Sequence, residues 1–187
     1  MHRAMTHAPL FDGKRIPLVP HPGNADREIG VAVLPEPTDD GRWLLDWQVT
    51  GDVVIPPPAA PERMDGLWQA TCFELFAMRG DGSYLEWNFA PSGHWAAYDF
   101  ADYRVRTSPP PAVEPPVIAW DPVRAHCRVL LEAPTCGERG ALRIGLSAVV
   151  ERTNGEREYF ALAHPQGVPD FHSPHCFARA VSPPPGP

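Results

Sequence analysis

The chain has 187 residues, of which 43% are hydrophobic and 21% charged, so it is long enough for one sizeable core and is expected to form a single domain, residues 1–187. A net charge of −7 argues against a nucleic-acid partner, because neutralising phosphates requires clustered Lys and Arg. No apolar run approaches the roughly 18 residues of a membrane span, and the first residues do not resemble a secretory signal. We therefore expect a cytoplasmic protein that does not bind membranes.

The N-terminal half contains the clearest strand signals. Residues 1–22 are expected to be irregular, as are residues 182–187, and the first strand is predicted at residues 28–34. In residues 42–50 hydrophobic side chains alternate with period two, which predicts a strand with one buried face. Residues 71–78 and 84–89 are predicted to form a hairpin, because the intervening Gly-Asp-Gly-Ser supplies the positive φ values that tight turns need.

The second half continues the same pattern. Strands are predicted at residues 95–103, 124–132 and 141–151, and Asn154-Gly155 predicts a hairpin that returns along residues 158–163. The proline-rich residues 56–61 and 109–116 fit neither a helix interior nor a central strand, so we expect them to cross between sheets. Eight or more short strands with regular turn signals predict an all-β protein, an antiparallel β-sandwich of jelly-roll or immunoglobulin-like type.

The four cysteines are widely spaced and form no CxxC pair: Cys72, Cys127, Cys136 and Cys176. In a chain without an export signal this pattern predicts free thiols that act as small buried hydrophobic residues.

Three polar residues, Glu74, Glu86 and Asn88, stand in otherwise apolar predicted strands. A buried carboxylate is costly unless it is hydrogen-bonded or faces water, so Glu86 and Asn88, which share one strand face, are expected to border something polar. That something is either a ligand, the solvent on an open face of the sheet, or the backbone of a proline-rich crossover. The sequence does not fix the strand register, which decides whether Glu74 and Glu86 share a face.

Two stretches carry a resemblance to a known family. A Trp precedes a strand reading Cys-Phe-Glu-Leu-Phe (residues 72–76), a Gly-Asp-Gly turn follows, and the next strand reads Tyr-Leu-Glu-Trp-Asn-Phe (residues 84–89) before Ala-Pro-Ser-Gly-His-Trp (residues 90–95). This pattern, with the tail at residues 161–172, resembles the DOMON-like domains of the bacterial uncharacterised branch, which are related to family 9 carbohydrate-binding modules.

The resemblance implies a β-sandwich that binds a sugar or a haem. In the family 9 modules a Trp stacks on a sugar ring and polar residues of the following strands accept its hydroxyl groups, and these roles fall on Trp68, Glu74, Glu86 and Asn88. The second stacking Trp of those modules has no counterpart here after Trp120, and Phe171 or His164 would have to replace it.

The C-terminal residues His164, Asp170, Phe171 and His172 lie in a Pro- and Gly-rich loop and are expected to line the pocket. With His175 and Cys176 they contain enough donors for a zinc ion, but their spacing matches no standard site, so no metal is expected.

We therefore predict a non-catalytic domain that binds a saccharide-like small molecule and needs no cofactor. In the cytoplasm this would be a nucleotide sugar or a cell-wall precursor. One alternative is a module for haem b, with Met64 or Met78 and one of the C-terminal histidines as axial ligands. Another is a protein-interaction domain with Trp68 and Trp95 as surface anchors. Glu74 and Glu86 could also form the acid and base of a glycosidase, although the sequence does not fix their separation.

Overall fold

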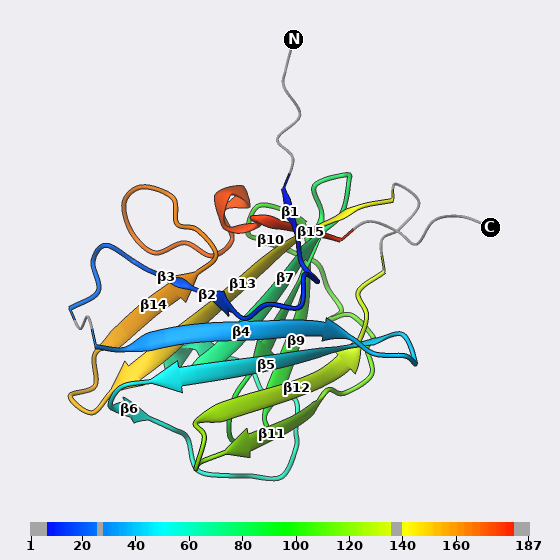
Figure 1. Cartoon of the computed structure of the whole chain (residues 1–187). Coiled ribbons are helices and arrows are strands. Elements are labelled where there is room, and N and C mark those ends of the chain that lie inside the picture. The colour runs from blue at the N-terminus through cyan, green and yellow to red at the C-terminus, as the bar shows by residue number, and fades with distance from the viewer. Residues whose placement is uncertain (1–6, 26–27, 136–139, 182–187) are drawn as a thin grey trace.

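The computed structural model describes residues 7–25, 28–135 and 140–181 and shows two β-sheets packed face to face (Figure 1). In the described residues the smaller sheet has five strands in the order β11-β12-β5-β4-β2. Their bounds are β11 Val117–Asp121, β12 His126–Glu132, β5 Arg42–Thr50, β4 Gly30–Pro37 and β2 Ile16–Pro17. Every pair in this sheet is antiparallel.

The larger sheet has ten strands in the described residues, with the main path β1-β15-β13-β7-β8-β9-β10. These are β1 Ala8–Pro9, β15 Arg179–Val181, β13 Leu142–Arg152, β7 Cys72–Met78, β8 Tyr84–Phe89, β9 Trp95–Asp102 and β10 Val105–Arg106. Three more strands complete it: β14 Arg157–Ala161 and β6 Val53–Val54 pair with β13, and β3 Val19–Pro20 pairs with β14. Among the strand pairs of the described residues, β1 and β15 alone run in parallel, so the predicted antiparallel β-sandwich is confirmed.

The main core lies between the two sheets and follows from the period-two alternation of the strands. All four hydrophobic side chains of the predicted buried face of β5 are at most 5% exposed: Trp43, Leu45, Trp47 and Val49. Trp47 stacks on Phe73 of β7 with ring centroids 5.2 Å apart, which joins the centres of the two sheets.

Both predicted hairpins are present. β7 pairs with β8 through the turn at Gly80 to Ser83, in which Gly82 has a φ of 91°. β13 pairs with β14 through the turn containing Asn154 and Gly155.

Some elements differ from the prediction. Residues 7–22 are not wholly irregular, because β1, β2 and β3 add short edge pairings there, and the predicted first strand is the fourth. β11 and β15 were not predicted. Residues 109–116 cross between the sheets as expected, whereas residues 56–61 connect β6 to β7 within the larger sheet. Residues 182–187 lie outside the described part of the chain.

Further side-chain predictions have mixed outcomes. Cys72, Cys127 and Cys176 are free and buried, as predicted, while Cys136 lies outside the described residues. Trp95 is only 8% exposed, so its proposed role as a surface anchor is wrong. The described residues contain no helix long and apolar enough to cross a membrane.

Candidate functional site

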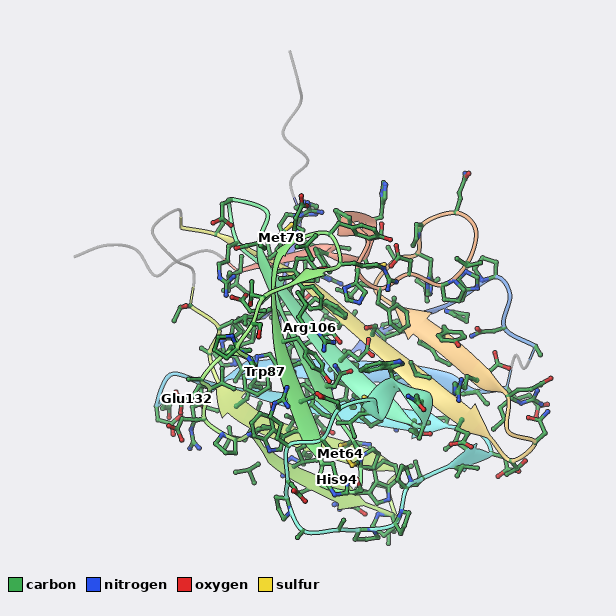
Figure 2. All side chains as sticks on the ribbon, turned by 180° about the vertical axis from the view of Figure 1, so that it is seen from behind. Met64, Met78, Trp87, His94, Arg106 and Glu132 are labelled. Carbon is green, nitrogen blue, oxygen red and sulfur yellow. The ribbon has the colours of Figure 1, made fainter. Side chains whose placement is uncertain are left out.

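The candidate site lies on the face of the larger sheet that points away from the smaller one (Figure 2). In β7 and β8 the residues between those of the main core form a second buried cluster, which the segment at residues 171–177 helps to cover. The register places Glu74 opposite Asn88 and Phe76 opposite Glu86. Glu74 and Glu86 are therefore diagonal neighbours on one face, which settles the question that the sequence left open.

A cavity of about 370 Å³ opens over this face. Its walls come from β7, β8, β13 and β14, from the β9–β10 hairpin, from the short 3-10 helix η1 (Leu67–Gln69) and from the C-terminal loop. The lining residues are Trp68, Glu74, Phe76, Glu86, Phe100, Arg104, Arg106, Val149, Arg157, Tyr159, Pro169, Phe171 and His172.

The floor of the cavity carries the two carboxyl groups. Glu74 is 4% exposed and accepts a hydrogen bond from Ser147 Oγ of β13 at 2.9 Å. Burial, reinforced by the charge of Glu86, raises the pKa of Glu74 to about 8, so this group is mostly protonated at neutral pH.

Glu86 is the more acidic of the two. Asn88 Nδ2 donates to its Oε1 at 2.6 Å, and this bond together with Arg106 and Arg104 partly offsets the effect of burial. The pKa of Glu86 is raised only to about 6. At neutral pH the floor therefore combines a protonated carboxyl group with a carboxylate, one a donor and the other an acceptor.

His172 stands beside Glu86 and is held by Tyr84. The backbone N–H of Arg104 donates to the Tyr84 hydroxyl at 3.0 Å, and that hydroxyl lies 2.9 Å from His172 Nδ1. Burial, followed by the charge of Arg104, lowers the pKa of His172 to about 4, so the ring is neutral. With the Tyr84 hydroxyl donating a hydrogen bond to Nδ1, the neutral ring carries its proton on Nε2, 3.6 Å from Glu86 Oε2.

The C-terminal loop is fastened to the β9–β10 turn. Asp170 accepts hydrogen bonds from Arg104 Nη2 at 2.8 Å and from the Tyr103 hydroxyl at 2.9 Å, and also from the backbone N–H of His172 at 3.2 Å. These bonds fix the stretch that brings Phe171 and His172 over the sheet.

Trp68 supplies an accessible aromatic surface to the cavity. It is 40% exposed and meets Tyr98 edge to face, with ring centroids 6.4 Å apart. η1, which carries Trp68, begins after Gly66, whose φ of 81° suits glycine.

The structure brings five of the eight predicted site residues to the cavity lining: Trp68, Glu74, Glu86, Phe171 and His172. Asn88 and Asp170 do not line the cavity but contact residues that do. Asn88 is hydrogen-bonded to Glu86, and Asp170 binds Arg104 and so fixes the C-terminal loop. His164 does not line the cavity: its Nε2 lies 2.8 Å from the carbonyl oxygen of Val19 and its ring packs against Phe171. Of the two candidates for the second stacking ring, only Phe171 lines the cavity.

The residues considered for haem or zinc do not converge. Met64 lies beside the start of β9 and Met78 ends β7, so they occupy opposite ends of the larger sheet (Figure 2). His175 is exposed in the short helix η3 (Pro174–Cys176). Among the described residues no group of three His, Cys, Asp or Glu side chains is arranged to hold a metal ion.

Sequence reasoning did not single out the three arginines of the lining, Arg104, Arg106 and Arg157. They are exposed residues of a tight hairpin and a strand start, positions where a basic side chain usually points into solvent.

No protein-family model matches the sequence, and no curated protein is significantly similar to it. A solved structure has a similar fold, a protein from Bacteroides uniformis ATCC 8492 described as a "putative carbohydrate-binding protein". It superposes with a TM-score of 0.62 over 90% of this chain and 85% of its own, at 15% sequence identity. At that identity the likeness establishes a shared β-sandwich fold.

Proposed function

We propose that this protein is a non-catalytic binding module that holds a saccharide in the cavity on the outer face of the larger sheet. The observation that carries the proposal is one cavity lined by the half-exposed indole of Trp68 and by two buried carboxyl groups, Glu74 and Glu86. A sugar has an apolar C–H face that packs on an aromatic ring and a rim of hydroxyl groups that need both donors and acceptors.

Each part of the cavity has a role in this proposal. Trp68 stacks on the ring, protonated Glu74 donates to a hydroxyl oxygen, and ionised Glu86 accepts from a hydroxyl group. His172 Nε2–H adds a second donor beside Glu86. Phe171, which comes from the C-terminal half and lines the cavity, takes the place of a second stacking Trp.

The positions of the two carboxyl groups favour binding over glycoside hydrolysis. Hydrolysis needs an acid and a base or nucleophile on either side of the scissile bond. Glu74 and Glu86 instead rise as diagonal neighbours from one sheet face, so both meet the same side of a ligand.

The same residues support membership of the DOMON-like domains related to family 9 carbohydrate-binding modules. The Trp before the first Glu-bearing strand and the Glu and Asn of the next strand, which that resemblance names, all lie in or directly behind the cavity. The fold shared with the Bacteroides uniformis protein, whose description names carbohydrate binding, points the same way.

The test measures sugar binding by Trp68→Ala and Glu74→Gln variants. Calorimetric titration with a panel of neutral, acidic and phosphorylated sugars should find a ligand for the native protein, and each variant should lose about tenfold or more in affinity. Trp120→Ala and Glu36→Gln, on the smaller sheet, are the matched controls and should keep native affinity.

Native affinity in both site variants would overturn the site. Added haemin is a second readout, because a haem absorption band that survives gel filtration would favour the haem alternative over sugar binding.

A further inference from the structure

The mouth of the cavity carries positive charge near Trp68. Arg106 lies over the face of Tyr98, with its guanidinium carbon 3.8 Å from the ring centroid, and Tyr98 in turn contacts Trp68. Arg157 Nε donates to the backbone carbonyl of Gln69, the residue after Trp68, at 2.9 Å. A ring stacked on Trp68 would thus have two guanidinium groups in its surroundings, and both line the same cavity.

These two arginines differ from the third. Arg104 is neutralised by Asp170 in an ion pair of 2.8 Å. Within the part of the chain that the structure describes, neither Arg106 nor Arg157 has a carboxylate at ion-pair distance. The nearby Asp65 accepts a hydrogen bond from the Tyr98 hydroxyl, and it forms an ion pair of 3.3 Å with Arg63 rather than with Arg106.

The donors of both side chains remain available. A guanidinium that lies on an aromatic face uses its π surface, so the N–H groups of Arg106 stay free for other partners. Arg157 commits only Nε, which leaves the two terminal nitrogens. Such groups match the paired oxygens of a carboxylate or a phosphate.

The ionised carboxylate of the floor, Glu86, is offset by the charges of both Arg104 and Arg106. Glu74 and Glu86 are at most 5% exposed on the floor, whereas the arginines are exposed at the mouth. A ligand can therefore turn its hydroxyl groups toward the floor and a charged substituent toward the arginines.

We propose that the ligand is an anionic saccharide, a sugar that bears a carboxylate or a phosphate, and that Arg106 and Arg157 bind this charged group. The inference rests on the proposed sugar-binding function and narrows its ligand class.

The experiment compares matched neutral and charged sugars by calorimetric titration. Glucose and galactose are paired with glucuronate and galacturonate for the carboxylate, and with their 6-phosphates and UDP-glucose for the phosphate. The native protein should bind one charged member about tenfold or more tighter than its neutral partner, with an affinity that falls as salt rises. If the uronates bind more tightly than the neutral sugars, the charged group is a carboxylate; if the phosphorylated sugars do, it is a phosphate.

Variants then locate the charge preference. Arg106→Gln and Arg157→Gln should each reduce the preference for the charged sugar and leave the melting temperature unchanged, while Arg106→Lys and Arg157→Lys retain part of it. Arg124→Gln, on the turn between β11 and β12 with a side chain 77% exposed, is the control and should behave as native.

The outcomes separate the two proposals. Equal affinity for neutral and charged sugars, or a charge preference that persists in the Arg106→Gln, Arg157→Gln double variant, overturns the anionic ligand but leaves sugar binding in place. Failure of every sugar in the panel to bind overturns the sugar-binding proposal, and the anionic ligand with it.

Discussion

Glu74 is a buried carboxyl group on the outer face of the larger sheet. Because burial raises its pKa, it makes the stability of the protein depend on pH. Its folded-state pKa of about 8 lies above the ordinary value of 4.5 for a glutamate, so between these values the folded state holds a proton that the unfolded state has lost. The free energy of unfolding should therefore fall as pH rises from about 4.5 to about 8.

The Glu74→Gln variant tests this directly. It should be more stable than the native protein at pH 8, on the order of 2 kcal/mol, and the difference should shrink toward pH 5. Urea unfolding at four pH values measures the effect, with Glu36→Gln on the surface of β4 as the control. A native and a variant protein with parallel pH profiles would show that Glu74 is ionised throughout.

His172 should make the free energy of unfolding fall as the pH is lowered below neutral, the opposite dependence to that of Glu74. Its folded-state pKa of about 4 lies below the ordinary value of 6.5 for a histidine, so the unfolded state takes up the proton first as pH falls. This histidine should cost the folded protein stability between pH 6.5 and pH 4, on the order of 2 kcal/mol.

Comparison of the native protein with His172→Gln isolates that contribution. The variant should gain stability relative to the native protein as the solution is acidified, whereas His175→Gln, an exposed neighbour, should follow the native profile. A nuclear magnetic resonance titration that finds His172 protonated at pH 6 would contradict the neutral ring inferred from its contacts.

At the scale of elements, β13 approaches the C-terminal segment more closely than a side chain would permit. A Cβ on Gly145 would lie 2.6 Å from Phe177 Cδ1 and 3.3 Å from Phe76 Cβ. Phe177 cannot easily retreat, because its ring stacks on Phe76 at 5.6 Å. The absence of a side chain at Gly145 thus lets the segment at residues 171–177 lie against the sheet.

Gly145→Ala should therefore push residues 171–177 away from the sheet. We expect a loss of about 1–3 kcal/mol in unfolding free energy and faster hydrogen exchange in residues 169–178. Gly30→Ala is a matched control in β4, since its Cβ would meet only the Thr50 hydroxyl, at 2.8 Å, on a side chain that can rotate. Unchanged exchange in the Gly145→Ala segment would show that the close contact does not hold it.

The elements also show what the sequence could and could not predict. Strict alternation and Asx-Gly turns were enough to predict β5, β7, β8 and the β13–β14 hairpin, because these signals are local. β15 has three residues and β11 lies at a sheet edge with Val117 62% exposed, so neither has a strong pattern.

The candidate site was harder for a related reason. Glu74, Glu86 and Asn88 alternate like residues of a solvated sheet face, yet Asn88 is fully buried. Their cover comes mainly from a C-terminal segment without periodicity, whose His172 lies beside Glu86 although it is far away in sequence. Such long-range packing leaves no trace in a local pattern.

On the scale of the whole molecule, the two faces of the larger sheet have different roles, one in the main core and the other in the candidate site. Its inner face meets the smaller sheet in the main core, and its outer face carries the second cluster around the cavity. Neighbouring side chains of β7 belong to different faces: Phe73 stacks on Trp47, while Phe76 lines the cavity and meets His172 with ring centroids 5.4 Å apart.

Substitutions on the two faces should therefore have different effects. Phe73→Leu should lower the unfolding free energy by about 1–2 kcal/mol through the main core, with no selective change in hydrogen exchange over residues 169–178. Phe76→Leu should cost a similar amount but should speed exchange in that segment and weaken ligand binding, since His172 and Phe177 lose their support. Identical exchange maps for the two variants would mean that the sandwich and its cover unfold as one cooperative unit rather than as a stable core with a separately stabilised site.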